Sequence, residues 1–134
     1  MNIIQDINFD FEILSDDDRG RITKIAQNVD VLRIVSSKGS KRAAHYHRKS
    51  SHICVLLSGA MIYYERKTNF NIKPTRIKIK PGDYFFTDRM FDHLMVFTKN
   101  SIFDCYSFGS RKKKDYENDL VRLDYDLEAT YHDW

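Results

Sequence analysis

Four of the five histidines of this chain have a spacing that suits metal binding. His45 and His47 are two residues apart, so on a β-strand both imidazoles point to the same face. His52 has the same spacing parity as Cys54 and Leu56 in the next apolar segment, so all three point to one face of a strand. His93 is the first residue of a later strand-like segment. Neutral imidazoles are ligands for divalent zinc, iron, nickel, manganese or copper. The spacing predicts that these four side chains converge on one divalent transition metal inside a β-domain.

Two tyrosines are candidates for proton transfer beside this metal. Tyr63 and Tyr84 fall in strand-like segments, and the sequence leaves open to which face of the sheet each side chain points. A phenol close to a reacting group can give or take a proton, whereas packing is the ordinary role of a tyrosine on a strand. Tyr63 and Tyr84 therefore join His45 and His47 as candidate catalytic residues, with core or surface packing as the alternative for both tyrosines.

Three cationic side chains flank the histidine pair. Arg42, Arg48 and Lys49 are candidate substrate-binding residues, because guanidinium and ammonium groups bind a carboxylate or phosphate well. A solvated rim is the alternative. The whole segment 31–82 carries twelve Lys or Arg and one acid, which gives it a charge of +11. Segments 1–30 and 83–134 carry −4 each, so the net charge of the chain is +3. We expect acidic strands from the ends to neutralise this segment, and we expect no nucleic-acid partner.

The segments that must position these residues are short and strand-like. Runs rich in β-branched and aromatic residues are 22–26, 29–36, 52–57, 60–65, 76–80, 84–87, 93–98 and 101–108. Residues 76–80 alternate cationic and apolar side chains, which is typical of a half-exposed strand. No segment before Gly109 keeps a helical period, so we predict an all-β sandwich or small barrel. The charged tail from Arg111 is predicted to form a short helix, an outer strand or an arm.

Composition limits the class of protein. A chain of 134 residues with 42% hydrophobic residues supports one core, so we predict a single domain over 1–134. Apolar runs are shorter than the roughly 18 residues of a membrane span, and the N-terminus lacks a signal peptide's pattern. We therefore expect a soluble, cytoplasmic protein without a membrane partner. Cys54 and Cys105 lie in apolar segments and are expected to be reduced, buried side chains.

The histidine spacing resembles the two motifs of the cupin family. Residues 39–59 read Gly-x5-His-x-His-x4-His-x6-Gly, similar to G-x5-H-x-H-x3-4-E-x6-G. Residues 82–97 keep the Gly and the His of G-x5-P-x-G-x2-H-x3-N and depart at its Pro, second Gly and Asn. The resemblance implies a cupin jelly-roll β-barrel with a short charged C-terminal extension. It also implies a divalent metal in the barrel mouth, held by His45, His47, His52 and His93.

One departure from the first motif affects the metal. His52 stands where the family has Glu, so a neutral ligand replaces an anionic one. Four neutral ligands leave the charge of the ion uncompensated, which strengthens it as a Lewis acid. The alternatives are that His52 is a hydrogen-bonded barrel histidine, leaving three ligands, or that the cluster binds no metal.

Three functions remain open at this stage. The first is a metal-dependent isomerase, dioxygenase or lyase for a small anionic or sugar-like substrate. The second is a metal-free sugar-nucleotide ketoisomerase or epimerase, since residues 42–48 resemble the R-G-x-H-A-H-K element of dTDP-sugar ketoisomerases and 116–122 their acidic Y-D-E-x-D-Y-I-R ending. The third is a non-catalytic ligand-binding cupin. Family likeness also implies a homodimer, formed through an N-terminal strand or the charged tail.

Overall fold

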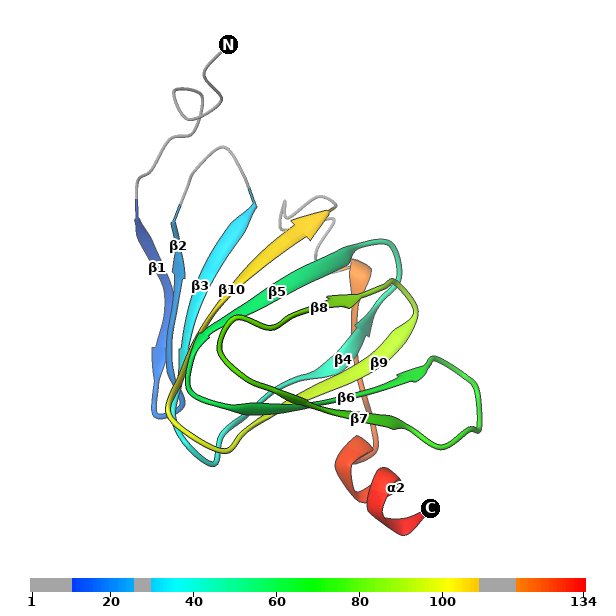
Figure 1. Cartoon of the computed structure of the whole chain (residues 1–134). Helices are drawn as coiled ribbons and strands as arrows, with labels where there is room; N and C mark the ends of the chain where they lie inside the picture. Colours follow the sequence, from blue (N-terminus) through cyan, green and yellow to red (C-terminus); the bar gives the residue numbers. More distant parts are fainter. Residues whose placement is uncertain (1–10, 26–29, 109–117) are drawn as a thin grey trace.

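The computed structural model describes residues 11–25, 30–108 and 118–134. Within these residues the chain forms two antiparallel β-sheets that face each other (Figure 1). The six-stranded sheet has the order β1-β2-β3-β10-β5-β8, and the five-stranded sheet has the order β11-β4-β9-β6-β7. The arrangement is a jelly-roll sandwich, so the predicted all-β fold is confirmed.

The strands are short, as the spacing of turn residues predicts. The six-stranded sheet contains β1 (Glu12–Asp17), β2 (Gly20–Lys24), β3 (Val31–Ser36), β10 (Ser101–Phe108), β5 (Ser51–Ser58) and β8 (Tyr84–Thr87). The five-stranded sheet contains β11 (Leu120–Arg122), β4 (Lys41–His47), β9 (Phe91–Phe97), β6 (Met61–Lys67) and β7 (Thr75–Ile79). The turn predicted at residues 27 and 28 lies outside the described residues.

The main core lies between the two sheets. In β3 and β5 every second residue is buried, which is the pattern of a strand with one face on a core. The inward apolar side chains come from both sheets: Leu32, Ile34, Cys54, Leu56, Met61, Tyr63, Ile79, Phe85, Met95, Phe97, Phe103 and Cys105. Both cysteines are buried, as expected.

Strand β4 contains a bulge that changes which residues face the core. Ala43 and Ala44 have φ angles of 73° and 56°, in the left-handed region. Arg42 pairs with Met95 of β9, and His45 pairs with His93, so β4 has one more residue than β9 over this stretch. The extra residue lets Arg42 and His45 point to the same inner face, although strict alternation would place them on opposite faces.

The C-terminal segment supplies both an outer strand and a helix, two of the three forms predicted for the tail. β11 pairs with β4, and α2 (Leu127–Asp133) lies beside β6 and β9 (Figure 1). Asp126 caps α2, because its side chain accepts hydrogen bonds from the backbone amides at 128 and 129. Leu127 packs with Tyr64 and Leu94 in a second apolar cluster on the outer face of the five-stranded sheet.

A polar cluster lies on the same outer face. The carboxylate of Asp92 accepts a hydrogen bond from Thr68 Oγ1 at 2.7 Å and another, very short one from the Tyr125 hydroxyl. The Arg66 guanidinium lies 5.0 Å from the centre of the Tyr125 ring. Burial and the Asp92 carboxylate raise the pKa of Tyr125 to about 12, so its hydroxyl keeps its proton and donates. Both carboxylate oxygens of Asp92 therefore have protein partners.

Acids from outside the basic segment pair with some of its cations. Lys41 Nζ lies 2.8 Å from Glu128 Oε1, and Arg33 Nε lies 2.7 Å from Asp104 Oδ1. These pairs agree with the expected neutralisation of segment 31–82 by its neighbours. Within the described part of the chain, no helix is both long enough and apolar enough to cross a membrane.

Candidate metal centre

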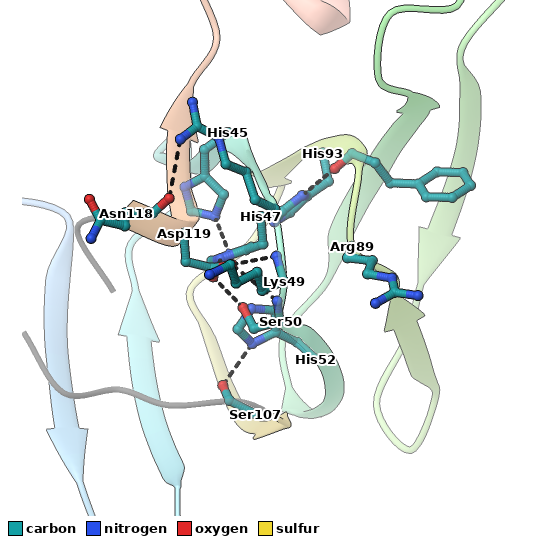
Figure 2. Close-up of polar contacts among 12 residues, drawn as sticks. His45, His47, Lys49, Ser50, His52, Arg89, His93, Ser107, Asn118 and Asp119 are labelled. Atoms are coloured by element: carbon teal, nitrogen blue, oxygen red, sulfur yellow. Dashed lines mark hydrogen bonds and ion pairs between the residues drawn. The ribbon is translucent and has the colours of Figure 1, made fainter. Parts of the chain in front are cut away.

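Three of the predicted ligands form a compact cluster between β4 and β9. His45, His47 and His93 each offer a ring nitrogen, and these atoms all lie within 4.8 Å of one another. The register of β4 and β9 causes this, because His45 and His93 are directly paired and His47 follows two residues along β4. Figure 2 shows the imidazoles turned toward a common point. Two members of the cluster are buried, with His47 3% and His93 2% exposed, and His45 is partly buried.

The spacing of two of these nitrogens suits one ion. The Nε2 atoms of His45 and His47 are 3.2 Å apart. Two nitrogens bound to a tetrahedral zinc at about 2.0–2.1 Å lie about 3.3 Å from each other. Nitrogen donors of this kind favour borderline transition ions over magnesium or calcium. The residues present therefore fit a divalent transition metal.

Hydrogen bonds at the far nitrogens fix two of the rings. His47 Nδ1 donates to Asp119 Oδ2 at 2.7 Å, and His93 Nδ1 donates to the carbonyl oxygen of Phe91 at 3.0 Å (Figure 2). With Nδ1 protonated, the lone pair of each neutral ring is at Nε2, on the side of the cluster. Such contacts set the tautomer and orientation of metal-binding histidines.

The environment keeps the imidazoles of His45 and His93 neutral. Burial, opposed by the Phe91 carbonyl and reinforced by the neighbouring His47 and His52, lowers the pKa of His93 to about 3. Burial, followed by the proximity of His93 and His47, also places the pKa of His45 far below its ordinary value. Neutral rings have the lone pairs that a metal requires.

Asp119 is a functional residue that sequence reasoning did not select. Burial opposes its ionisation, but hydrogen bonds from Ser50, His47 and the amides of Lys49 and Ser50 lower its pKa to about 2. Ser50 Oγ donates to Asp119 Oδ2 at 2.5 Å. The carboxylate is therefore a fixed anion behind His47. The likeness of 116–122 to an acidic family ending was the one signal that included it.

His52 lies next to the cluster and outside the set of three. Its ring centre is 4.3 Å from that of His47, while its Nδ1 is 2.7 Å from Ser107 Oγ and 3.7 Å from Cys105 Sγ. Its Nε2 is buried and has no hydrogen-bond partner among the described residues. The compact ligand set thus contains three histidines, which agrees with the alternative that His52 is a hydrogen-bonded barrel histidine.

The two candidate tyrosines lie in different places. Tyr63 is buried, its hydroxyl is 2.5 Å from Thr87 Oγ1, and its ring centre is 6.4 Å from that of His93. Burial raises its pKa well above the ordinary value, so it keeps its proton. Tyr84 is 75% exposed, because β8 turns Phe85 and Thr87 inward and Tyr84 outward. The surface alternative therefore describes Tyr84, which corrects its place in the catalytic set.

The three candidate cations also separate. Arg42 lines the cavity and is held by Ser36 Oγ, 2.5 Å from its Nε. Arg48 is exposed and donates to the carbonyl oxygen of Asn118, and Lys49 contributes its backbone amide to Asp119. Neither Arg48 nor Lys49 lines the cavity, which corrects their predicted contact with substrate through their side chains.

A cavity lies at the histidine cluster and reaches both the space between the sheets and the outer apolar cluster, since Leu94, Tyr125 and Leu127 also line it. Its volume is about 530 Å³, which suits a small ligand. The three clustered histidines, His52 and Thr87 line it, together with apolar side chains such as Leu32 and Phe103. Arg122 also lines it and pairs with His45 across β11 and β4. Sequence reasoning missed Arg122, because β11 falls in a tail whose form was left open.

Comparisons with known proteins give a fold and no family assignment. No family model matches the sequence, and no curated protein is significantly similar to it. CapF from Staphylococcus aureus, a capsular polysaccharide assembling protein, superposes with a TM-score of 0.75 and 15% identity, covering 91% of this chain and 34% of CapF. KdgF from Halomonas sp. gives 0.64 and 15%, covering 77% of this chain and 90% of KdgF.

An enzyme is also among these structures. An oxalate decarboxylase from B. subtilis gives a TM-score of 0.66 and 14% identity, covering 87% of this chain and 31% of the enzyme. This chain therefore spans about a third of the length of CapF and of the decarboxylase. Similarity at these identities shows the fold alone. The chain has a cupin fold, as the two motifs predicted.

Proposed function

We propose that this cupin-fold protein is an enzyme that uses a divalent transition metal, held by His45, His47 and His93, on a small anionic or sugar-like substrate. The observation that carries the proposal is the cluster of three imidazoles, two buried and one partly buried, whose nitrogens lie within 4.8 Å of one another in the wall of a cavity. When bound, such an ion would supply Lewis-acid chemistry for an isomerase or lyase, or, if redox-active, oxygen activation for a dioxygenase.

The chain supplies the binding groups around that ion. Arg122 at the cavity wall is suited to the carboxylate or phosphate of an anionic substrate, because a guanidinium binds these groups with two parallel hydrogen bonds. The unpartnered Nε2 of His52 can form a hydrogen bond with a substrate beside His47. The apolar wall excludes water from the buried His52 and strengthens its contact, whereas Arg122 lies at the exposed side of the cavity.

Two of the structurally similar proteins support this substrate class. The names of CapF and the decarboxylase refer to a capsular polysaccharide and to oxalate, one a sugar polymer and the other a small anion. Both names concern those proteins, and here they favour a screen that includes sugar acids and small dicarboxylates.

The metal content of protein purified without a metal-affinity tag tests the proposal. We expect about one ion per chain in the wild type and its loss in His47→Ala and His93→Ala, measured by elemental mass spectrometry. His132→Gln is the matched control, since His132 lies on α2 outside the cluster and should leave the ion in place. Wild-type protein that stays empty after incubation with zinc, iron, nickel, manganese and copper would exclude the metal-dependent function.

A metal-free sugar-nucleotide ketoisomerase or epimerase is the second candidate. The observation that favours it is the 2.7 Å hydrogen bond between His47 and Asp119, because Asp119 falls in the segment that resembles the acidic ending of dTDP-sugar ketoisomerases. A histidine oriented by a buried carboxylate suits acid and base catalysis. Turnover of a nucleotide-sugar by chelator-treated protein would establish this candidate, and binding without turnover would support the non-catalytic alternative.

A further inference from the structure

The two cysteines of the chain lie directly opposite each other in the cavity wall. Cys54 on β5 and Cys105 on β10 are register partners in the six-stranded sheet. Both side chains point inward, since Cys54 is 1% exposed and Cys105 is 7% exposed. Directly opposed residues of antiparallel strands have Cα atoms about 4.5–5.5 Å apart. A disulfide requires about 4.4–6.8 Å between Cα atoms, so this Cα spacing suits a bond between the two sulfurs. The Cβ atoms of such opposed residues, ordinarily about 4.5–5.5 Å apart, must close to about 3.5–4.5 Å when the bond forms.

The cavity gives a small oxidant access to this pair. Cys54 and Cys105 both line the cavity of about 530 Å³, together with His52. Cys105 is the more exposed of the two, and its Sγ lies 3.7 Å from His52 Nδ1, close enough for a hydrogen bond that involves sulfur. An oxidant that enters the cavity therefore meets Cys105 first.

We propose that Cys54 and Cys105 form a peroxide-sensitive dithiol, which closes into a disulfide between β5 and β10 inside the cavity. The structure holds both residues as thiols, which is the reduced state of this site. The proposal does not depend on the metal or on the enzyme activity proposed above, because neither cysteine belongs to the three-histidine cluster.

The chemistry is balanced with hydrogen peroxide as the oxidant. In the first step the peroxide O–O bond breaks, one oxygen bonds to the Cys105 sulfur as a sulfenic acid, and the other leaves as water. In the second step the Cys54 sulfur bonds to the Cys105 sulfur, and the sulfenic oxygen leaves as a second water with the Cys54 proton. Two thiols and one peroxide give one disulfide and two waters, and both electrons go to the peroxide oxygens.

Peroxide treatment of the full-length protein tests the proposal directly. The chain has two cysteines in total, so an intramolecular disulfide has a single possible assignment. We expect the intact mass to fall by two hydrogen atoms and a non-reduced digest to contain one cross-linked peptide pair. The treatment is carried out on zinc-treated and on chelator-treated protein, and we expect the cross-link in both. Oxygen uptake at cysteine without a cross-link, or a cross-link only between two chains, would overturn the proposal.

Two serine variants test the order of reaction. In Cys54→Ser, we expect Cys105 to be trapped by a sulfenic-acid probe such as dimedone. In Cys105→Ser, we expect Cys54 to remain a thiol over the same time, because it is more deeply buried. Equal labelling of both variants would overturn the order. The cross-link in wild-type protein remains a test of the site should either variant fail to fold.

Discussion

The two faces of strand β9 differ in how completely the polar groups around them are hydrogen-bonded within the protein. On the outer face, Asp92 is bonded to Thr68 and Tyr125, so both of its carboxylate oxygens have protein partners. On the inner face, the cluster that contains His93 lies next to His52, whose buried Nε2 has no hydrogen-bond partner among the described residues. A buried polar group without a partner is costly. The contrast indicates that the outer face is built for stability and the inner face for a ligand that the protein itself does not supply.

Truncation of the outer apolar cluster should have the largest effect on stability. Leu127→Ala removes a side chain that is 1% exposed and packs with Tyr64 and Leu94. We expect the free energy of unfolding to fall by about 3 kcal/mol, as for other buried leucines. Urea denaturation measures the loss, and elemental analysis should still find about one metal ion per chain. Loss of the metal from folded Leu127→Ala would remove the distinction between the two faces.

Lowering the pH should reduce the free energy of unfolding through His93 on the inner face. The pKa of His93 is about 3 in the folded protein and 6.5 in a model compound, so between these values the unfolded state binds a proton that the folded state does not. The contribution of neutral His93 to the free energy of unfolding is therefore present above pH 6.5 and is lost as the pH falls toward 3. For chelator-treated protein we expect a loss of about 2 kcal/mol between about pH 6.5 and about pH 4.5, from about 1.4 kcal/mol per pKa unit.

Urea denaturation of His93→Gln at the same two pH values is the control. This variant should lose less stability with acid than the wild type does, because its side chain does not titrate. The prediction fails if both proteins have the same pH dependence.

Asp119→Asn should weaken the inner face without removing a metal ligand. The amide cannot serve as the anion that accepts from His47, Ser50 and the backbone. Loss of such a partner lowers metal affinity about 10–100-fold in other proteins, and we expect a similar change here. Competition with a coloured chelator measures it. Unchanged affinity would mean that Asp119 holds β11 in place and does not act through His47.

Asp92→Asn should have the smallest effect and should be confined to the outer face. The amide keeps one acceptor for Thr68 or Tyr125 and loses the other, so we expect a loss of about 1 kcal/mol in the free energy of unfolding. Metal affinity should match the wild type in the competition assay. A weaker metal site in this variant would show that the two faces are coupled through β9.

Local patterns in the sequence predicted most of the strands and most of the cluster, while β1, β4 and β11 were not among the predicted runs. Alternation of buried and exposed residues is a property of neighbours in the chain, so β3 and β5 could be recognised. His45 and His47 share a face for the same reason. Tyr84 was placed with the catalytic residues because parity tells which residues share a face and does not tell which face is inward.

Contacts between distant segments could not be predicted in this way. Asp119 and His47 are 72 residues apart in the chain, and Arg122 reaches His45 only through the pairing of β11 with β4. The bulge at Ala44 is equally hidden, because alanine has no preference for the left-handed region that would mark it in the sequence.

The bulge in β4 has a consequence for how this strand can change in evolution. Removing Ala44 would shift the phase of β4 by one residue, so either Arg42 or the pair His45 and His47 would turn outward. The extra residue therefore sets the facing of one half of β4 relative to the other. A deletion at this position would need a compensating insertion nearby for Arg42 and the two histidines to keep the same face.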